Sequence, residues 1–206
     1  MSFPVFSTSD LIALRQNERL RMLVDFLYAS DHDSRITAIE RIMDSAYKRT
    51  TMNANFHYEK SEDEITISIV DMIRFSGIDI AHDRKIGGHC DITILSSDDF
   101  LWIAEAKIHS SYNWLDKGFK QLATRYSTGS PGQDHGEVLI YCKVKDAKSV
   151  LETWRDELTT RHSDVVIVED NIESQLRFRT THVHERSGLT FYIRHRIVSV
   201  FFDPIA

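Results

Sequence analysis

Two neighbouring segments decide the fold of this chain: GGHCDITIL at residues 87–95 and LWIAEAKI at residues 101–108. Both are short and apolar, and turn-forming residues bound them, which predicts strands at 89–95 and 100–108. Residues 96–99 predict a tight turn between the two strands. With a further strand expected at 78–85, before the Gly87-Gly88 turn, the three segments predict an antiparallel meander.

The segments on either side extend this meander into an α/β domain. Upstream, Ser61 and Glu64 have the spacing of a capping box before a helix that ends at Gly77. Downstream, the pattern predicts helices at 114–126 and 146–160, a loop at 127–136, buried strands at 138–142 and 165–168, and strands at 176–184, 189–195 and 197–202. The strand–helix–strand order over 138–168 indicates a parallel crossover. The expected fold is therefore α/β, with a mixed central sheet flanked by helices.

The first 58 residues predict an N-terminal helical extension, and residues 59–206 the main domain. Ser9 and Asp10 are suited to cap a helix that runs to Leu27, and Ser34 is suited to cap a second helix that runs to Ala46. Residues 50–60 are polar and irregular in pattern, which favours a linker.

Composition excludes several classes of protein. The chain has 25 basic and 31 acidic residues and a net charge of −6, so it is not a globally basic nucleic-acid binder. Its two cysteines lie far apart with no CxxC motif, which argues against a disulfide framework or a zinc knuckle. A membrane span needs about 20 apolar residues, and the runs here reach about five. With no signal peptide visible, we expect a cytoplasmic protein with no membrane partner.

The candidate catalytic residues lie mainly in the segment 101–108. Side chains alternate along a strand, so Glu105 and Lys107 point to one face of an otherwise apolar segment. Burying both is costly unless they reach a cleft, a metal or water. Pairing across the turn sets residues whose numbers sum to about 195 opposite one another, which brings Asp91 close to Glu105.

Two converging carboxylates repel each other, and a divalent cation relieves that repulsion. Hard oxygen ligands favour Mg²⁺ or Mn²⁺. A third acid is expected from the helix after Ser61, where Glu62 lies within about 40° of the centre of the apolar stripe and Glu64 lies nearly opposite. The choice between Glu62 and Glu64 stays open. Farther along, Gln121 is suited to orient a water or a phosphate oxygen, and Lys117, Lys120 and Arg125 are suited to form a basic rim.

This order of motifs resembles the PD-(D/E)xK nuclease superfamily, which has the restriction-endonuclease-like fold. The resemblance covers residues 59–142, and Cys90 stands before Asp91 where proline is common. It implies that Asp91, Glu105, Glu62 and the carbonyl of Ala106 bind Mg²⁺. It also implies that Lys107 positions or deprotonates the attacking water, and that Gln121 is the glutamine of the later helix.

The expected function is that of a Mg²⁺-dependent endonuclease that hydrolyses DNA, as an effector or component of a bacterial anti-phage defence or DNA-repair system. One alternative is a catalytically inactive nucleic-acid-binding or assembly module of the same fold, and another is an RNA-directed nuclease. We expect a homodimer, or a partner subunit bound through the N-terminal helices, because cutting both strands of a duplex commonly needs two active sites.

Overall fold

The computed structural model describes residues 7–14 and 16–204 of the chain. The chain divides into two compact units, Met1–Ala46 and Tyr47–Ala206. The boundary lies inside helix α3 (His32–Met52), upstream of the expected division between residues 58 and 59. The candidate functional residues all belong to the second unit.

The first unit contains α1 (Thr8–Leu14), α2 (Glu18–Leu27) and the greater part of α3. The prediction of one helix from Ser9 to Leu27 was wrong, because Asn17 starts a separate helix. Its side chain accepts hydrogen bonds from the backbone N–H groups of Arg19 and Leu20. Ser34 was also the wrong cap for the next helix. Asp31 has that role, and its Oδ1 accepts from Ser34 N at 2.7 Å.

The segment expected to be an irregular linker is largely helical. Helix α3 continues to Met52, and a short helix α4 (Ala54–His57) follows it. Thr50 and His57 are both buried. These two polar residues therefore lie inside the second unit, whereas the polar pattern of the segment favoured a linker.

The second unit is built on one mixed sheet, which has seven strands among the described residues. The strands are β1 (Asp79–Lys85), β2 (His89–Leu95), β3 (Leu101–Ile108), β4 (His135–Cys142), β5 (Val166–Asp170), β6 (Arg177–Val183) and β7 (Thr190–Ser199), in the spatial order β1-β2-β3-β4-β7-β6-β5. The β1-β2-β3 meander is antiparallel, as predicted, and β3, β4 and β7 run parallel. Antiparallel pairing of β7, β6 and β5 completes the sheet.

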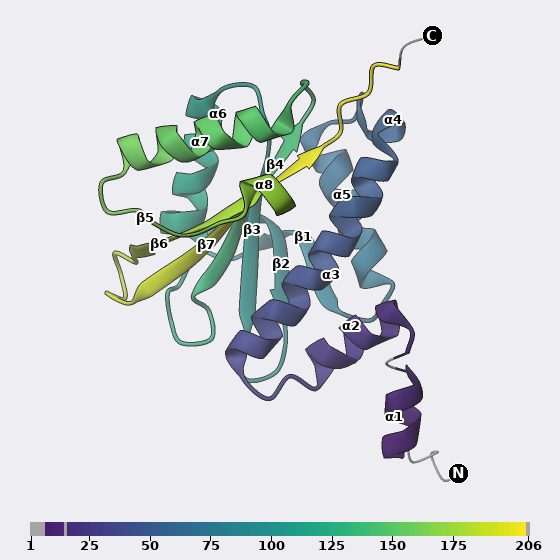
Figure 1. Cartoon of the computed structure of the whole chain (residues 1–206). Helices are drawn as coiled ribbons and strands as arrows, with labels where there is room; N and C mark the ends of the chain where they lie inside the picture. The colour runs from purple at the N-terminus through teal and green to yellow at the C-terminus, as the bar shows by residue number, and fades with distance from the viewer. Residues whose placement is uncertain (1–6, 15, 205–206) are drawn as a thin grey trace. The chain divides into compact units, whose positions relative to one another are not determined.

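Helices cover both faces of this sheet, which confirms the predicted α/β class (Figure 1). On one face, α6 (Tyr112–Lys120), the π-helix η1 (Gln121–Tyr126) and α7 (Ala147–Arg161) enclose a core with Ile103, Val138 and Ile140. Helix α5 (Glu62–Arg74) lies on the other face, where Thr66 Oγ1 is 2.9 Å from the hydroxyl of Tyr141. Ile140 and Tyr141 alternate along β4, so the two helical layers are separated by the sheet.

The C-terminal strands differ from the prediction in two respects. Residues 165–168 were expected to form a buried strand, but β5 is a sheet edge on which Val166 and Val168 are exposed. An apolar run does not distinguish a central strand from an edge strand, because both contain β-branched residues. The strands expected at 189–195 and 197–202 are instead the single strand β7. The predicted parallel crossover from β4 through α7 to β5 is present, with β7 and β6 lying between them.

A balanced group of polar side chains is buried on the α5 side of the sheet. Both carboxylate oxygens of Glu137 accept hydrogen bonds, one from the Tyr47 hydroxyl and one from Arg194 Nε. Glu137 and Arg194 are register partners on β4 and β7, and both are buried. We call Tyr47, Glu137 and Arg194 the Glu137 cluster.

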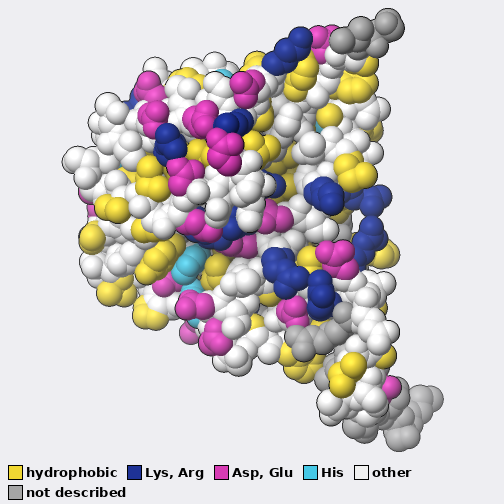
Figure 2. All heavy atoms as spheres, viewed as in Figure 1, with side chains coloured by type: hydrophobic (Ala, Val, Ile, Leu, Met, Phe, Trp, Pro, Cys, Tyr) yellow, Lys and Arg dark blue, Asp and Glu magenta, His cyan; other side chains and the backbone are white. Residues whose placement is uncertain are grey.

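The surface of the chain carries mixed charge. Basic and acidic side chains are interspersed on the face shown in Figure 2. The ion pairs of the described residues include Lys148–Glu173 and Arg155–Asp170. Within the described residues, no helix has both the length and the apolar character needed to cross a bilayer.

Candidate functional site

The pairing of β2 with β3 brings Asp91 to the acidic end of β3. The register joins Ile92 to Ala104 and Leu95 to Leu101, one step from the register expected from the turn. Asp91 directly precedes Ile92, and its Oδ2 accepts a hydrogen bond from the backbone N–H of Ala106 at 2.8 Å. The side chain of Asp91 is thereby held against the strand that carries Glu105 and Lys107.

Three carboxylates converge on the ammonium group of Lys107. Its Nζ lies 2.6 Å from Glu105 Oε1, 3.4 Å from Glu62 Oε1 and 3.8 Å from Asp91 Oδ2. It also donates to the Ala106 carbonyl at 2.9 Å. Glu105 and Lys107 are almost completely buried. We call Glu62, Asp91, Glu105 and Lys107 the Lys107 cluster. One ammonium faces three acids, so the cluster is net negative when all of them are ionised.

The structure distinguishes the two acids at the start of α5. Glu62 Oε2 accepts a hydrogen bond from the backbone N–H of Ile108 at 2.7 Å, so its side chain reaches β3. Glu64 instead closes the capping box with Ser61, as its spacing predicted. Glu64 also pairs with Lys60, and it stays exposed. Of these two acids, Glu62 is therefore the one that joins the Lys107 cluster.

Burial and mutual repulsion strongly perturb the cluster. Burial, followed by the negative charge of Asp91, raises the pKa of Glu105 to about 7. Burial also raises the pKa of Asp91, against the opposing effect of Lys107. Burial alone would lower the pKa of Lys107, but the surrounding carboxylates outweigh it and hold that pKa above its ordinary value. The ammonium therefore stays charged at neutral pH.

Two buried acceptor atoms next to this cluster have no hydrogen-bond donor among the described residues. They are Glu105 Oε2 and Gln121 Oε1. Gln121 uses its other amide atom, Nε2, to donate to the Tyr126 hydroxyl at 3.2 Å. An orphaned carboxylate oxygen inside an acidic cluster suits a hard cation, and Asp91, Glu62 and the Ala106 carbonyl offer further oxygen donors. The chemistry of this donor set is therefore of the kind that a hard divalent cation such as Mg²⁺ or Mn²⁺ takes.

Helix α6 contributes two residues that the sequence analysis did not assign to the site. A Cβ on Gly118 would lie 2.8 Å from Lys107 Cγ, so the helix can approach the lysine this closely only because this residue is glycine. The Trp114 ring centroid lies 5.4 Å from Lys107 Nζ. A glycine inside an otherwise regular helix was the available signal for the first contact.

The predicted basic rim is only partly assembled. Lys117 Nζ lies 4.7 Å from the Trp114 ring centroid and so borders the site. Lys120 Nζ pairs with Asp116 Oδ2 at 2.7 Å, so the ammonium of Lys120 is held along its own helix α6. Arg125 is exposed, and its carbonyl would lie only 2.4 Å from a Cβ on Gly87. The Gly87-Gly88 turn thus makes room for η1, since a Cβ on Gly88 would meet the Tyr126 ring at 2.7 Å.

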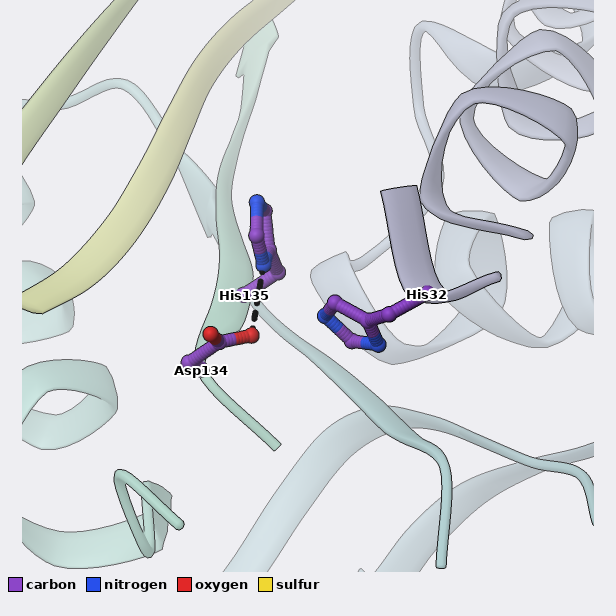
Figure 3. A group of neighbouring side chains, drawn as sticks. All are labelled: His32, Asp134 and His135. Carbon is purple, nitrogen blue, oxygen red and sulfur yellow. Dashed lines mark hydrogen bonds and ion pairs between the residues drawn. The ribbon is translucent and has the colours of Figure 1, made fainter. Parts of the chain in front are cut away.

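A separate acid–histidine pair lies at the opposite end of the parallel strands. Asp134 Oδ1 and His135 Nδ1 are 2.7 Å apart, and their side chains point toward each other in Figure 3. His135 is the register partner of Trp102, whereas Lys107 pairs with Ile140 five residues along, roughly 16 Å away. His32, also drawn there, belongs to the first unit. The Asp134–His135 pair is therefore not part of the Lys107 cluster.

Chemically, the Lys107 cluster combines carboxylate oxygens with a charged ammonium, and Gln121, outside the cluster, adds an amide oxygen that has no donor among the described residues. Comparison with protein-family models, curated proteins and solved structures finds no match.

Proposed function

We propose that this chain is a Mg²⁺-dependent endonuclease that hydrolyses phosphodiester bonds of DNA. The observation that carries the proposal is the convergence of Glu62, Asp91 and Glu105 on Lys107 Nζ. The order of these residues along the chain resembles the PD-(D/E)xK motif, and a mixed sheet with helices on both faces is compatible with the restriction-endonuclease-like fold.

The acidic residues would hold the cation, together with the Ala106 carbonyl. When bound, a divalent ion supplies positive charge to the phosphate and lowers the pKa of its water. Glu105 fits this role best, because its Oε2 is buried and has no donor among the described residues. Because the pKa of Glu105 is raised to about 7, this carboxyl is partly protonated near neutral pH, and cation binding there would release its proton.

Lys107 and Gln121 would act on the reacting groups. Because the pKa of Lys107 is raised, its ammonium remains protonated and stabilises negative charge on the phosphate, in preference to accepting a proton from water. Gln121 Oε1 is free to accept a hydrogen bond from the attacking water and so to orient it. These two residues supply charge and orientation, and the acids supply the cation site.

Dimerisation belongs to the same proposal. Cutting both strands of a duplex commonly needs two active sites, which a homodimer would supply. The helices of the first unit are the segment that we assign to this contact or to a partner subunit, and such an assembly would fit a role in defence or repair.

A cleavage assay on supercoiled plasmid tests the proposal. Wild type should nick or linearise it with Mg²⁺ or Mn²⁺ and not with EDTA. Lys107→Ala should lose about 10²–10⁴-fold in rate, the usual contribution of one catalytic group. Lys148→Ala is the matched control, because Lys148 lies on α7, is partly exposed and pairs with Glu173. It should cleave like wild type.

Other outcomes favour the alternatives. Cleavage of RNA without cleavage of DNA would indicate an RNA-directed nuclease. DNA binding that survives Asp91→Ala, with no cleavage in any metal, would indicate an inactive binding module. Equal inertness of wild type and Lys107→Ala on plasmid, linear and single-stranded DNA and on RNA would refute the enzyme proposal.

A further inference from the structure

Trp114 is a large aromatic side chain left partly in solvent beside the Lys107 cluster. It is 36% exposed, whereas the other two tryptophans, Trp102 and Trp154, are completely buried. Its backbone N–H donates to the side chain of Ser111, the N-cap of α6, at 3.2 Å. The cap fixes the first turn of the helix, so the ring is presented from a rigid element.

The ring shares one face of its helix with groups already placed at the site. Trp114, Lys117, Gly118 and Gln121 have the spacing i, i+3, i+4 and i+7 that defines a single helix face. Gly118 on this face packs against the Lys107 side chain. The indole therefore stands at the margin of the cluster, with Lys107 Nζ 5.4 Å and Lys117 Nζ 4.7 Å from its ring centroid.

We infer that Trp114 stacks on an unpaired base next to the scissile phosphate, and that Lys117 contacts a neighbouring phosphate. The protein then acts on single-stranded DNA, or on unpaired nucleotides within a duplex, in preference to paired DNA. This inference rests on the proposed nuclease function.

The physical reason is access to the base. Aromatic side chains beside a lysine are the usual platform for unpaired strands, because every base has a π-face and every nucleotide carries a phosphate. In a duplex both faces of an internal base are already stacked on its neighbours, so a rigid indole gains no stacking partner there.

Tryptophan fluorescence tests the contact directly, because Trp102 and Trp154 are shielded from solvent. Full-length protein in EDTA is titrated with a short thymidine oligonucleotide, and the emission is followed. The expected result is saturable quenching in wild type. Trp114→Phe should show none, because only buried tryptophans remain. A duplex of the same length should quench wild type far less.

Binding affinities measured by anisotropy of a labelled oligonucleotide provide the second readout. Trp114→Ala should bind the single strand about tenfold more weakly, as expected for the loss of one stacking contact. Trp114→Phe keeps a ring and should recover part of that loss. Phe75→Ala is the matched control, because Phe75 is 96% exposed at the far end of α5, about 20 Å along the helix from Glu62. It should bind like wild type.

Failure of this inference can be told apart from failure of the nuclease proposal. If wild type cleaves DNA but shows no quenching, or if Trp114→Ala binds the single strand as wild type does, stacking is refuted and the nuclease stands. If quenching and the loss of affinity occur but no substrate is cleaved with any metal, the contact stands without the enzyme. Equal quenching by duplex and single strand refutes the preference for unpaired bases.

Discussion

Two groups of charged side chains lie on the same sheet, and they differ in the number of carboxylates that face each cation. In the Glu137 cluster, one carboxylate meets one guanidinium, and both of its oxygens accept hydrogen bonds. In the Lys107 cluster, three carboxylates meet one ammonium, and one oxygen of Glu105 is left without a donor among the described residues. Glu105 and Lys107 are nearly as deeply buried as Glu137 and Arg194, whereas Glu62 and Asp91 remain partly exposed. The two groups also differ in the ratio of carboxylates to cations.

Comparison of the two clusters shows that burial of charged side chains does not by itself indicate a functional site. A buried carboxylate that faces a guanidinium, and whose two oxygens both accept hydrogen bonds, is compatible with a purely structural role. A buried cluster with surplus negative charge costs folding free energy and persists when something outside the chain neutralises it. This difference supports the proposal that the Lys107 cluster binds a cation, whereas the Glu137 cluster needs only a structural role in the sheet.

Removing the carboxylate of the balanced cluster should produce the largest effect on stability. Glu137→Gln leaves the buried Arg194 guanidinium facing a neutral group, which should lower the free energy of unfolding by about 3 kcal/mol or more. Urea denaturation at pH 7.5 measures it. An unchanged denaturation midpoint would show that the pair does not support the fold and would remove the basis of the comparison.

The corresponding Glu-to-Gln substitution in the Lys107 cluster should raise the free energy of unfolding, whereas Glu137→Gln should lower it. The pKa of Glu105 is about 7 in the folded protein against an ordinary value of 4.5, so the unfolded chain releases this proton first. Stability then falls as pH rises from 4.5 through 7, and the full cost is present above pH 7. Glu105→Gln should therefore raise the free energy of unfolding by about 1–3 kcal/mol at pH 8 and have little effect near pH 4.5.

Urea denaturation at the two pH values checks this sign. Added Mg²⁺ should stabilise wild type at pH 8 and should have a smaller effect on Glu105→Gln, because the variant lacks one ligand charge. Destabilisation of Glu105→Gln at pH 8 would contradict the assignment of surplus negative charge to this site.

A third buried group, the imidazole of His195, is neutral in the folded protein. It provides the smallest of the expected effects on stability. His195 accepts a hydrogen bond from Trp154 Nε1 at 3.1 Å and lies 2.9 Å from Thr180 Oγ1. Burial lowers the pKa of His195 to about 3 from an ordinary 6.5, so the unfolded chain takes up the proton first as pH falls. Its contribution to stability is complete above pH 6.5 and is lost between there and pH 3, by about 2 kcal/mol at pH 5.

The measurement is best made in Glu105→Gln, because Glu105 contributes a slope of the opposite sign. The free energy of unfolding is measured at pH 7.5 and pH 5 for the Glu105→Gln variant, which is the parent, and for the double variant that also carries His195→Gln. The difference between the two gives the contribution of the histidine. The parent should lose more stability than the variant as pH falls. Equal losses would mean that His195 is protonated in the folded state.

The sequence predicted those parts of the site that depend on periodicity. The turn at 96–99 placed Asp91 opposite the end of β3, and helical phase favoured Glu62 over Glu64, because local geometry sets both positions. The order of the β1-β2-β3 meander followed from the same short-range signals. The choice of Ser34 as a cap failed because Asp31 and Ser34 are both good capping residues at neighbouring positions.

The parts that could not be predicted depend on contacts between distant segments. Nothing near Glu137 in the sequence indicates that Tyr47 and Arg194 will meet it. The apolar run at 165–168 does not reveal that β5 has only one neighbour. Trp114 has the ordinary appearance of a core aromatic residue, and only the packing of α6 on β3 leaves its ring at the surface.

The glycine at position 118 gives the Lys107 cluster a mechanical property. Because α6 rests directly on the stem of Lys107 with no Cβ between them, the helix limits where that stem can lie. One added methyl group at this position would press the stem at 2.8 Å and shift the ammonium while every charge in the chain stayed the same. Placement of the ammonium can thus be varied separately from its charge, through a residue that has no functional group.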